Sequence, residues 1–210
     1  MPGGGSIGYP IFRLDYSNDE DFELYKMYWD HFLKTEFYVP EVVDPDDITW
    51  FWVNDKTRLD GKGPLEVRRL FQELCVTAFP PGSKFLWLCL TVDREAIESM
   101  LRVYGPPAKQ VLEALPLSLP SVRTKEISFL PYVAAVDTTW AEANGDEITN
   151  PIQDGSQVND GKYRGQFKCA LRSVFRLWQM EQVIQPEELY PKNGKIWGDT
   201  SVVFETPLID

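Results

Sequence analysis

The chain has 210 residues, of which 43% are hydrophobic, so it is long enough for one domain with a substantial core. Its formal net charge of −11 argues against nucleic acid and anionic membranes as partners, because both are bound mainly through Lys and Arg. No apolar run reaches the length of about 18 residues that a membrane-spanning helix needs.

The cysteines predict a reducing compartment. Cys75, Cys89 and Cys169 are widely spaced and lie in apolar patterns, which is typical of buried, reduced thiols. The first residues carry neither the basic nor the apolar segment of a secretory signal. We therefore expect a cytoplasmic protein.

The N-terminal region predicts a strand followed by a helix. Residues 1–8 are rich in glycine, and we expect them to be disordered. Residues 11–16 alternate in polarity, which favours a short strand. Ser17, followed three residues later by Glu20, has the form of a capping box, and the apolar spacing after it predicts a helix to about Lys34.

The next elements are a second strand and a second helix. Residues 48–53, ITWFWV, are rich in β-forming side chains and predict a strand. Pro64 follows a glycine-containing turn and is placed to begin a helix. The apolar stripe of this helix consists of Val67, Leu70, Phe71, Leu74 and Ala78.

Residues 85–92 form the most apolar segment of the chain. A strand that is apolar on both sides has both faces covered, so we expect it at the centre of the sheet. Asp93 stops the strand and can accept the free N–H groups of a following helix. That helix has a single apolar stripe, formed by Ile97, Met100, Leu101 and Tyr104.

The C-terminal half mixes strands with long loops. Residues 127–136 predict a second apolar strand, in which Pro131 suggests an edge or a bulge. Residues 137–162 predict a long loop, either a functional lid or disordered. The spacing of Phe167, Ala170, Leu171, Val174 and Trp178 predicts a helix, and residues 202–204 predict a final short strand.

These elements predict an α+β fold. We expect one domain over residues 9–210, with a mainly antiparallel or mixed sheet covered by helices. The alternation of strands and helices is too irregular for a doubly wound parallel sheet.

Few motifs in the sequence indicate a metal or cofactor site. The acidic group Asp44, Asp46 and Asp47 lies between prolines and is interpreted as a solvated loop, because no second acidic cluster faces it. The glycines of residues 3–8 match a dinucleotide-binding pattern, but they follow no strand and open no helix. We therefore predict no metal site and no cofactor.

His31 is the only histidine of the chain, so any catalysis that depends on histidine has to use it. It lies within the predicted helix that ends near Lys34. One interpretation is a partly exposed helical side chain, and the other is a general base at the edge of a pocket. We take His31 as the candidate catalytic residue.

Four tryptophans are candidate substrate-binding residues. Trp50 and Trp52 are two positions apart and therefore share one face of a predicted strand. Trp140 and Trp197 lie in polar, loop-like sequence, where the core has less need of a ring. Rings on a sheet and on neighbouring loops are common material for an apolar ligand pocket.

The order of the central segments resembles proteins of filamentous fungi with no assigned activity. The shared features are LDGKGPLEVRRLF over residues 59–71, a strand that runs into LTVDREAIESML over residues 90–101, and a late helix with Arg and Trp. This resemblance implies a fungal cytosolic protein and transfers no catalytic residues. Some fungal proteins of this size are similar to cofactor-free cyclases and isomerases of secondary metabolism.

Two functions fit these observations. The first is a cofactor-independent isomerase or cyclase that holds an apolar small molecule among aromatic rings. The second is a non-catalytic module that binds another protein through its acidic surface. A homodimer is compatible with either function.

Overall fold

The computed structural model describes residues 8–35, 50–79, 87–104, 131–140, 162–191 and 195–198. It contains one mixed sheet with the strand order β2-β1-β3-β4-β5. The strands are β1 (Pro10–Arg13), β2 (Phe51–Val53), β3 (Leu88–Val92), β4 (Tyr132–Asp137) and β5 (Gln166–Ala170). This arrangement confirms the predicted α+β fold with a mixed sheet.

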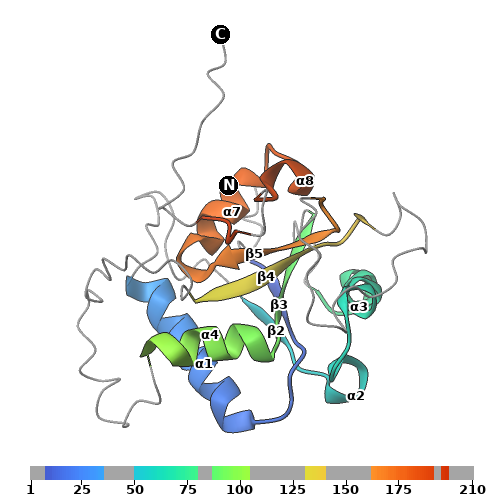
Figure 1. Ribbon diagram of the computed structural model, residues 1–210. Coiled ribbons are helices and arrows are strands. Elements are labelled where there is room, and N and C mark those ends of the chain that lie inside the picture. The colour runs from blue at the N-terminus through green and yellow to red at the C-terminus, as the bar shows by residue number, and fades with distance from the viewer. Residues whose placement is uncertain are drawn as a thin grey trace, which may run out of the picture.

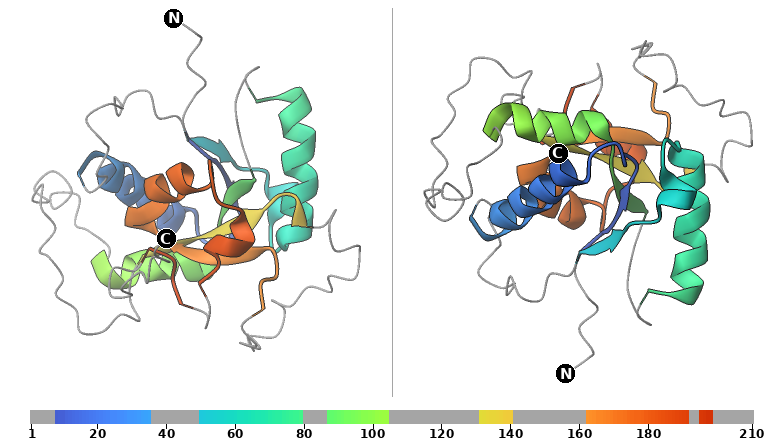
Figure 2. Two further views of the ribbon diagram at one scale, coloured as in Figure 1. Left: turned by 90° about the horizontal axis from the view of Figure 1, so that it is seen from above. Right: turned by 90° about the horizontal axis from the view of Figure 1, so that it is seen from below.

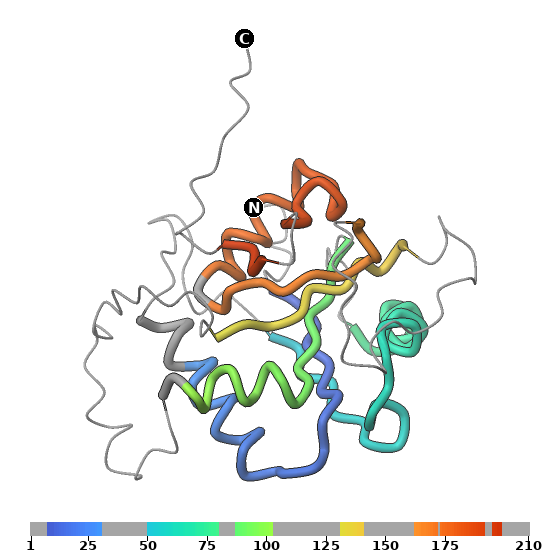
Figure 3. Tube along the Cα trace, in the orientation of Figure 1, coloured from blue at the N-terminus to red at the C-terminus, as the bar shows by residue number. Residues whose placement is uncertain are grey.

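Helices cover both faces of the sheet (Figures 1 and 2). Helices α1 (Asp19–Thr35) and α4 (Arg94–Tyr104) run side by side on one face, and Figure 3 shows their neighbouring paths. The short α2 (Lys56–Leu59) and α3 (Pro64–Thr77) lie on the other side. The C-terminal part contains the 3₁₀ helix η3 (Leu171–Ser173), α7 (Val174–Met180) and α8 (Pro186–Leu189).

The strand order separates a parallel half of the sheet from an antiparallel half. Strand β1 pairs in parallel with both β2 and β3. Strand β4 then pairs antiparallel with β3, and β5 antiparallel with β4. The three parallel strands therefore all begin at the same end of the sheet. We call this end, where the strands start, the amino edge.

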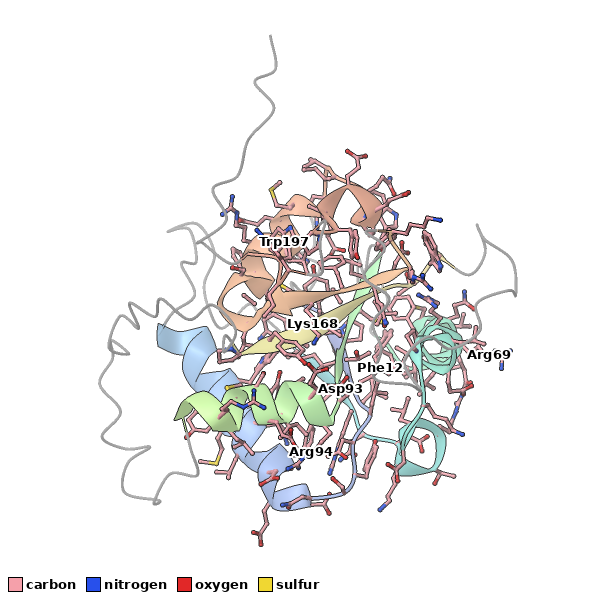
Figure 4. All side chains as sticks on the ribbon, viewed as in Figure 1. Phe12, Arg69, Asp93, Arg94, Lys168 and Trp197 are labelled. Atoms are coloured by element: carbon pink, nitrogen blue, oxygen red, sulfur yellow. The ribbon has the colours of Figure 1, made fainter. Side chains whose placement is uncertain are left out.

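Strand β3 has the central position that its apolar sequence predicts. Every one of its residues is buried. Leu88, Leu90 and Val92 belong to the larger core, which also contains residues of α1 and α4. Cys89 belongs to the smaller core beneath α3, together with Phe12. Figure 4 shows Phe12 on the α3 side of the sheet and Arg69 on the outer surface of that helix.

The predicted cap of α4 is present. The Asp93 carboxylate accepts a hydrogen bond of 2.8 Å from the Ala96 backbone N–H. In contrast, the predicted capping box at α1 is wrong. Asn18 accepts from the N–H groups of Glu20 and Asp21, whereas the Ser17 hydroxyl donates to Asp15.

Two further expectations need correction. Residues 166–170 form β5 instead of the start of a helix, because Gln166, Phe167, Lys168 and Cys169 alternate in burial and pair with β4. Pro131 marks neither an edge strand nor a bulge. It precedes β4, which lies between β3 and β5.

Several expectations concern residues outside the described ranges: 1–7, 85–86, 141–161 and 202–204. Within the described ranges, no helix is long and apolar enough to cross a bilayer.

The different roles of Ser17 and Asn18 can be tested by mutation. Asn18→Ala removes the acceptor at the start of α1, and we expect a loss of about 1 kcal/mol in the free energy of unfolding. Ser17→Ala should change it by less than about 0.5 kcal/mol, as for an ordinary surface position. Urea denaturation of both variants provides the measurement. A larger loss for Ser17→Ala would contradict the observed cap.

Candidate functional site

An aromatic residue precedes each of the three parallel strands. Tyr9 comes before β1, Trp50 before β2 and Trp87 before β3. Because these strands start at the same edge, residues from three distant parts of the sequence lie there. The ring centroids of Tyr9 and Trp50 are 6.3 Å apart.

Helix α1 adds the Trp29 ring to Tyr9 and Trp50. Trp29 meets Trp50 edge to face, with ring centroids 5.2 Å apart, and meets Trp52 in the same way at 5.6 Å. Phe22 contacts the other side of this group, 5.7 Å from Trp52. The structure therefore brings Trp50 and Trp52 together around Trp29, on the side of the sheet that α1 covers.

A buried carboxyl group lies beside Tyr9. Glu181 follows directly after α7 and is only 1% exposed. The backbone N–H groups of Trp87 and Leu88 donate to its carboxylate at the start of β3. The Tyr9 hydroxyl, on a side chain that is also 1% exposed, donates to the same carboxyl group.

Burial has a large effect on the protonation of this pair. Loss of hydration raises the pKa of Glu181 from 4.5 to about 8, and the donors around the carboxylate counteract only part of that rise. Burial, followed by the neighbouring Glu181 carboxylate, raises the pKa of Tyr9 well above its ordinary value. Tyr9 is therefore a neutral donor, while Glu181 changes charge close to physiological pH.

Trp29 Nε1 is buried in this region and makes no hydrogen bond within the described residues. The Tyr9 hydroxyl and the Glu181 carboxyl face each other, although their contact does not reach standard hydrogen-bond geometry. A buried polar atom without a partner costs about 1–3 kcal/mol, so such atoms are uncommon and call for an explanation. We call Tyr9, Trp29, Trp50 and Glu181 the amino-edge cluster.

The other predicted site residues lie elsewhere or outside the described side chains. His31 belongs to α1, but its side chain is outside the described part. Trp197 forms an isolated bridge with Cys169 of β5, at the edge of the sheet opposite β2. Figure 4 shows Trp197 on the α7 side of the molecule. The structure therefore does not bring Trp197 next to Trp50 and Trp52.

Trp140 belongs to a separate polar arrangement at the end of β4. Its ring meets Tyr163 edge to face, with centroids 4.8 Å apart. The Tyr163 hydroxyl donates to the Asp137 carboxylate over 3.0 Å. The buried Arg68 donates to the backbone carbonyls of Asp137 and Gly165, over 2.6 and 2.9 Å. Arg68 thus joins α3 to β4 and to the segment before β5.

Glu181 and Tyr9 were not predicted from the sequence. The signal for Glu181 was present, because it lies seven residues after Val174 and four after Leu177, on the buried side of α7. Tyr9 precedes a short strand and has no distinguishing local pattern. Its proximity to Glu181 depends on the packing of the C-terminal segment.

No cluster of three or more His, Cys, Asp or Glu side chains within the described ranges could hold a metal ion. Asp44, Asp46 and Asp47 lie outside those ranges. Comparisons with protein-family models, curated proteins and solved structures found no match for this chain. Function therefore has to be inferred from the chemistry of the residues themselves.

The close packing around Trp140 can be tested at Gly165. This glycine has a φ of +74°, and an added Cβ would collide with the Trp140 ring and the Arg68 guanidinium. Gly61 is a matched control, with a φ of +66° and open space around the same position. Gly61→Ala should cost about 1–2 kcal/mol of stability through its backbone alone. Gly165→Ala should cost roughly 1–3 kcal/mol more, from overpacking.

Urea denaturation of the two glycine variants measures both losses. Equal losses would show that Trp140 and Arg68 do not press on Gly165.

The protonation of Glu181 predicts a dependence of stability on pH. Between pH 4.5 and about 8 the folded protein holds a proton that the unfolded chain has released. Stability should therefore fall as pH rises through this range, by up to about 1.4 kcal/mol per pH unit from this group. Tyr9, which faces the carboxyl, and Cys89, which interacts with it electrostatically, stay neutral because burial raises the pKa of both.

Urea unfolding of the wild type and Glu181→Gln between pH 5 and 9 checks this effect. The variant cannot ionise, so its stability relative to the wild type should increase up to about pH 8 and then level off. The exposed Glu187→Gln is the control and should follow the wild type. A constant difference between Glu181→Gln and the wild type would contradict the prediction.

Proposed function

We propose that this protein is a cofactor-independent enzyme, of the isomerase or cyclase type, that moves a proton on an apolar small molecule at the amino-edge cluster. The observation that carries the proposal is the buried Glu181 carboxyl, which pairs with the Tyr9 hydroxyl, while the Tyr9 ring neighbours Trp50. Aromatic walls favour an apolar ligand, and the carboxyl supplies acid–base chemistry.

The carboxyl suits proton transfer in either direction. A pKa of about 8 leaves both protonation states of Glu181 accessible near neutral pH, which is the condition for efficient general acid–base catalysis. In an isomerisation, the Glu181 carboxylate would remove a proton from one carbon of the substrate and return it to another. The substrate's electron pair shifts between those steps, and no net proton, electron or co-reactant is consumed.

Rings would contribute orientation and exclusion of water. Trp29 and Trp50 meet edge to face, so they present surfaces at a large angle to one another. Such walls would hold a flexible apolar molecule in one reactive conformation. In this proposal Trp52, on β2, packs against Trp29. His31, Trp140 and Trp197 have no role in the reaction. The proposed partner is therefore an apolar small molecule, and neither nucleic acid nor a membrane.

Double-bond migration provides a direct test. Purified protein is incubated with a panel of β,γ-unsaturated ketones of increasing size, beginning with cyclohex-3-en-1-one. Formation of the conjugated enone is followed by ultraviolet absorbance. Glu181→Gln should lose about 100-fold or more in rate, and Glu187→Gln should keep the wild-type rate. The wild-type rate should change with pH around 8, the pKa of Glu181, and the variant should lack this transition.

The outcome also distinguishes the two functions considered from the sequence. A rate that is the same in wild type and Glu181→Gln, or no reaction across the panel, would reject the enzymatic proposal. The non-catalytic, acidic interaction module would then be the remaining function. Thermal unfolding of each variant ensures that lost activity is not lost folding.

A further inference from the structure

We propose that Arg68 and Thr138 are positioning residues for Glu181, which they reach through two hydrogen-bonded peptide groups. The bonds run from α3 to the end of β4, then to the start of β3, and end on the Glu181 carboxyl. We call this series of bonds the backbone relay. The inference rests on the proposed function, in which Glu181 is the reacting group.

The first peptide group of the relay joins Arg68 to the start of β3. Arg68 is 2% exposed, and its Nε donates to the Asp137 carbonyl over 2.6 Å. The same peptide group carries the Thr138 N–H, which donates to the Trp87 carbonyl over 2.7 Å. Because the C=O and N–H of a trans peptide point in opposite directions, this one group connects Arg68 with Trp87.

The second peptide group joins β4 to Glu181. The Trp87 carbonyl also accepts a hydrogen bond of 3.0 Å from the Thr138 hydroxyl, so two donors of one residue hold it. This carbonyl shares a peptide group with the Leu88 N–H, which donates to the Glu181 carboxylate. Thr138 therefore fixes the orientation of a donor that Glu181 uses.

All bonds of the relay have the same direction. Each peptide group accepts on the side of Arg68 and donates on the side of Glu181, so its positive end faces the carboxyl. A guanidinium group, which keeps its charge, lies at the far end. Arg68 and Thr138 are 2% and 5% exposed, and aligned hydrogen bonds strengthen one another where water is excluded. The relay therefore favours the ionised Glu181, which is the form that removes a proton.

The other titratable groups that act on this carboxyl, among the described residues, are neutral near pH 7. Tyr9 donates to it from the segment before β1, and Cys89 of β3 interacts with it electrostatically. Cys169 of β5 interacts with Tyr9. Burial raises the pKa of all three residues, so they stay neutral while Glu181 titrates.

Substitution of Thr138 tests the inference. Thr138→Val removes the hydroxyl donor and keeps the size of the side chain, so the Trp87–Leu88 peptide loses one of its two restraints. The titration midpoint of Glu181, about pH 8 in the wild type, should therefore rise. We expect a rise of about 0.3–1 pH unit, the upper limit being the loss of one whole hydrogen bond to a charged group.

Carbon NMR of the Glu181 side-chain carboxyl measures this midpoint, and Glu181→Gln identifies the resonance by its loss. Thr139→Val is the matched control, because its hydroxyl bond of 2.8 Å goes to the Asp137 carboxylate and not to a carbonyl of the relay. Thr139→Val should leave the midpoint unchanged, and Thr138→Ser should restore it. A midpoint in Thr138→Val within about 0.2 pH unit of the wild type, or an equal shift in Thr139→Val, would overturn the inference.

The far end of the relay is tested at Arg68. Arg68→Met removes the charge and both of its bonds to carbonyls, so the Glu181 midpoint should again rise. Arg69→Met is the control, because Arg69 lies on the outer surface of the same helix and should not affect the midpoint. An unchanged midpoint in a folded Arg68→Met would overturn the role of Arg68. Urea unfolding checks folding, and the Thr138 variants decide if Arg68→Met is unfolded.

The two proposals can fail separately. A higher midpoint in Thr138→Val, without isomerisation of any ketone by the wild type, would retain the relay and reject the enzyme. Isomerisation that depends on Glu181, with the same pH midpoint in wild type and Thr138→Val, would retain the enzyme and reject the positioning residues.

Discussion

The complete burial of β3 is the constraint on which the rest of the fold depends. Its alternate side chains enter two different cores, Leu88 and Leu90 on one side and Cys89 on the other. Both faces must therefore be covered, which requires helices on each side of the sheet. The chain steps from β1 to β2 in one direction and from β2 back past β1 to β3 in the other, so right-handed connections place α1 and α3 on opposite faces. The same geometry places three strand starts at one edge.

The sequence predicts elements well where the information is local. An unbroken apolar run, followed by a capping aspartate and a clear stripe, is enough for β3 and α4. Strand β5 is different, because Phe167 and Leu171 are four residues apart and fit a helix as well as a strand with a following turn. The pairing with β4 decides between them, and this long-range interaction is not visible in a window of the sequence.

The candidate site is less predictable, because it is formed by packing between distant segments. The period of two correctly places Trp50 and Trp52 on the side of the sheet where Trp29 lies. Nothing local indicates that Glu181 contacts Tyr9 or the N–H of Trp87. Its spacing from Val174 and Leu177 indicates the buried side of α7, but not which groups it meets there. Those partners become evident only once the C-terminal segment is placed against the start of β3.

The wide separation of the cluster in the sequence has a consequence for how the protein is made. Tyr9, Trp29 and Trp50 emerge early from the ribosome, whereas the carboxyl group arrives with Glu181. The three rings are therefore synthesised well before the carboxyl group. The cluster is complete only after Glu181, which follows α7, has been synthesised and has packed against the start of β3.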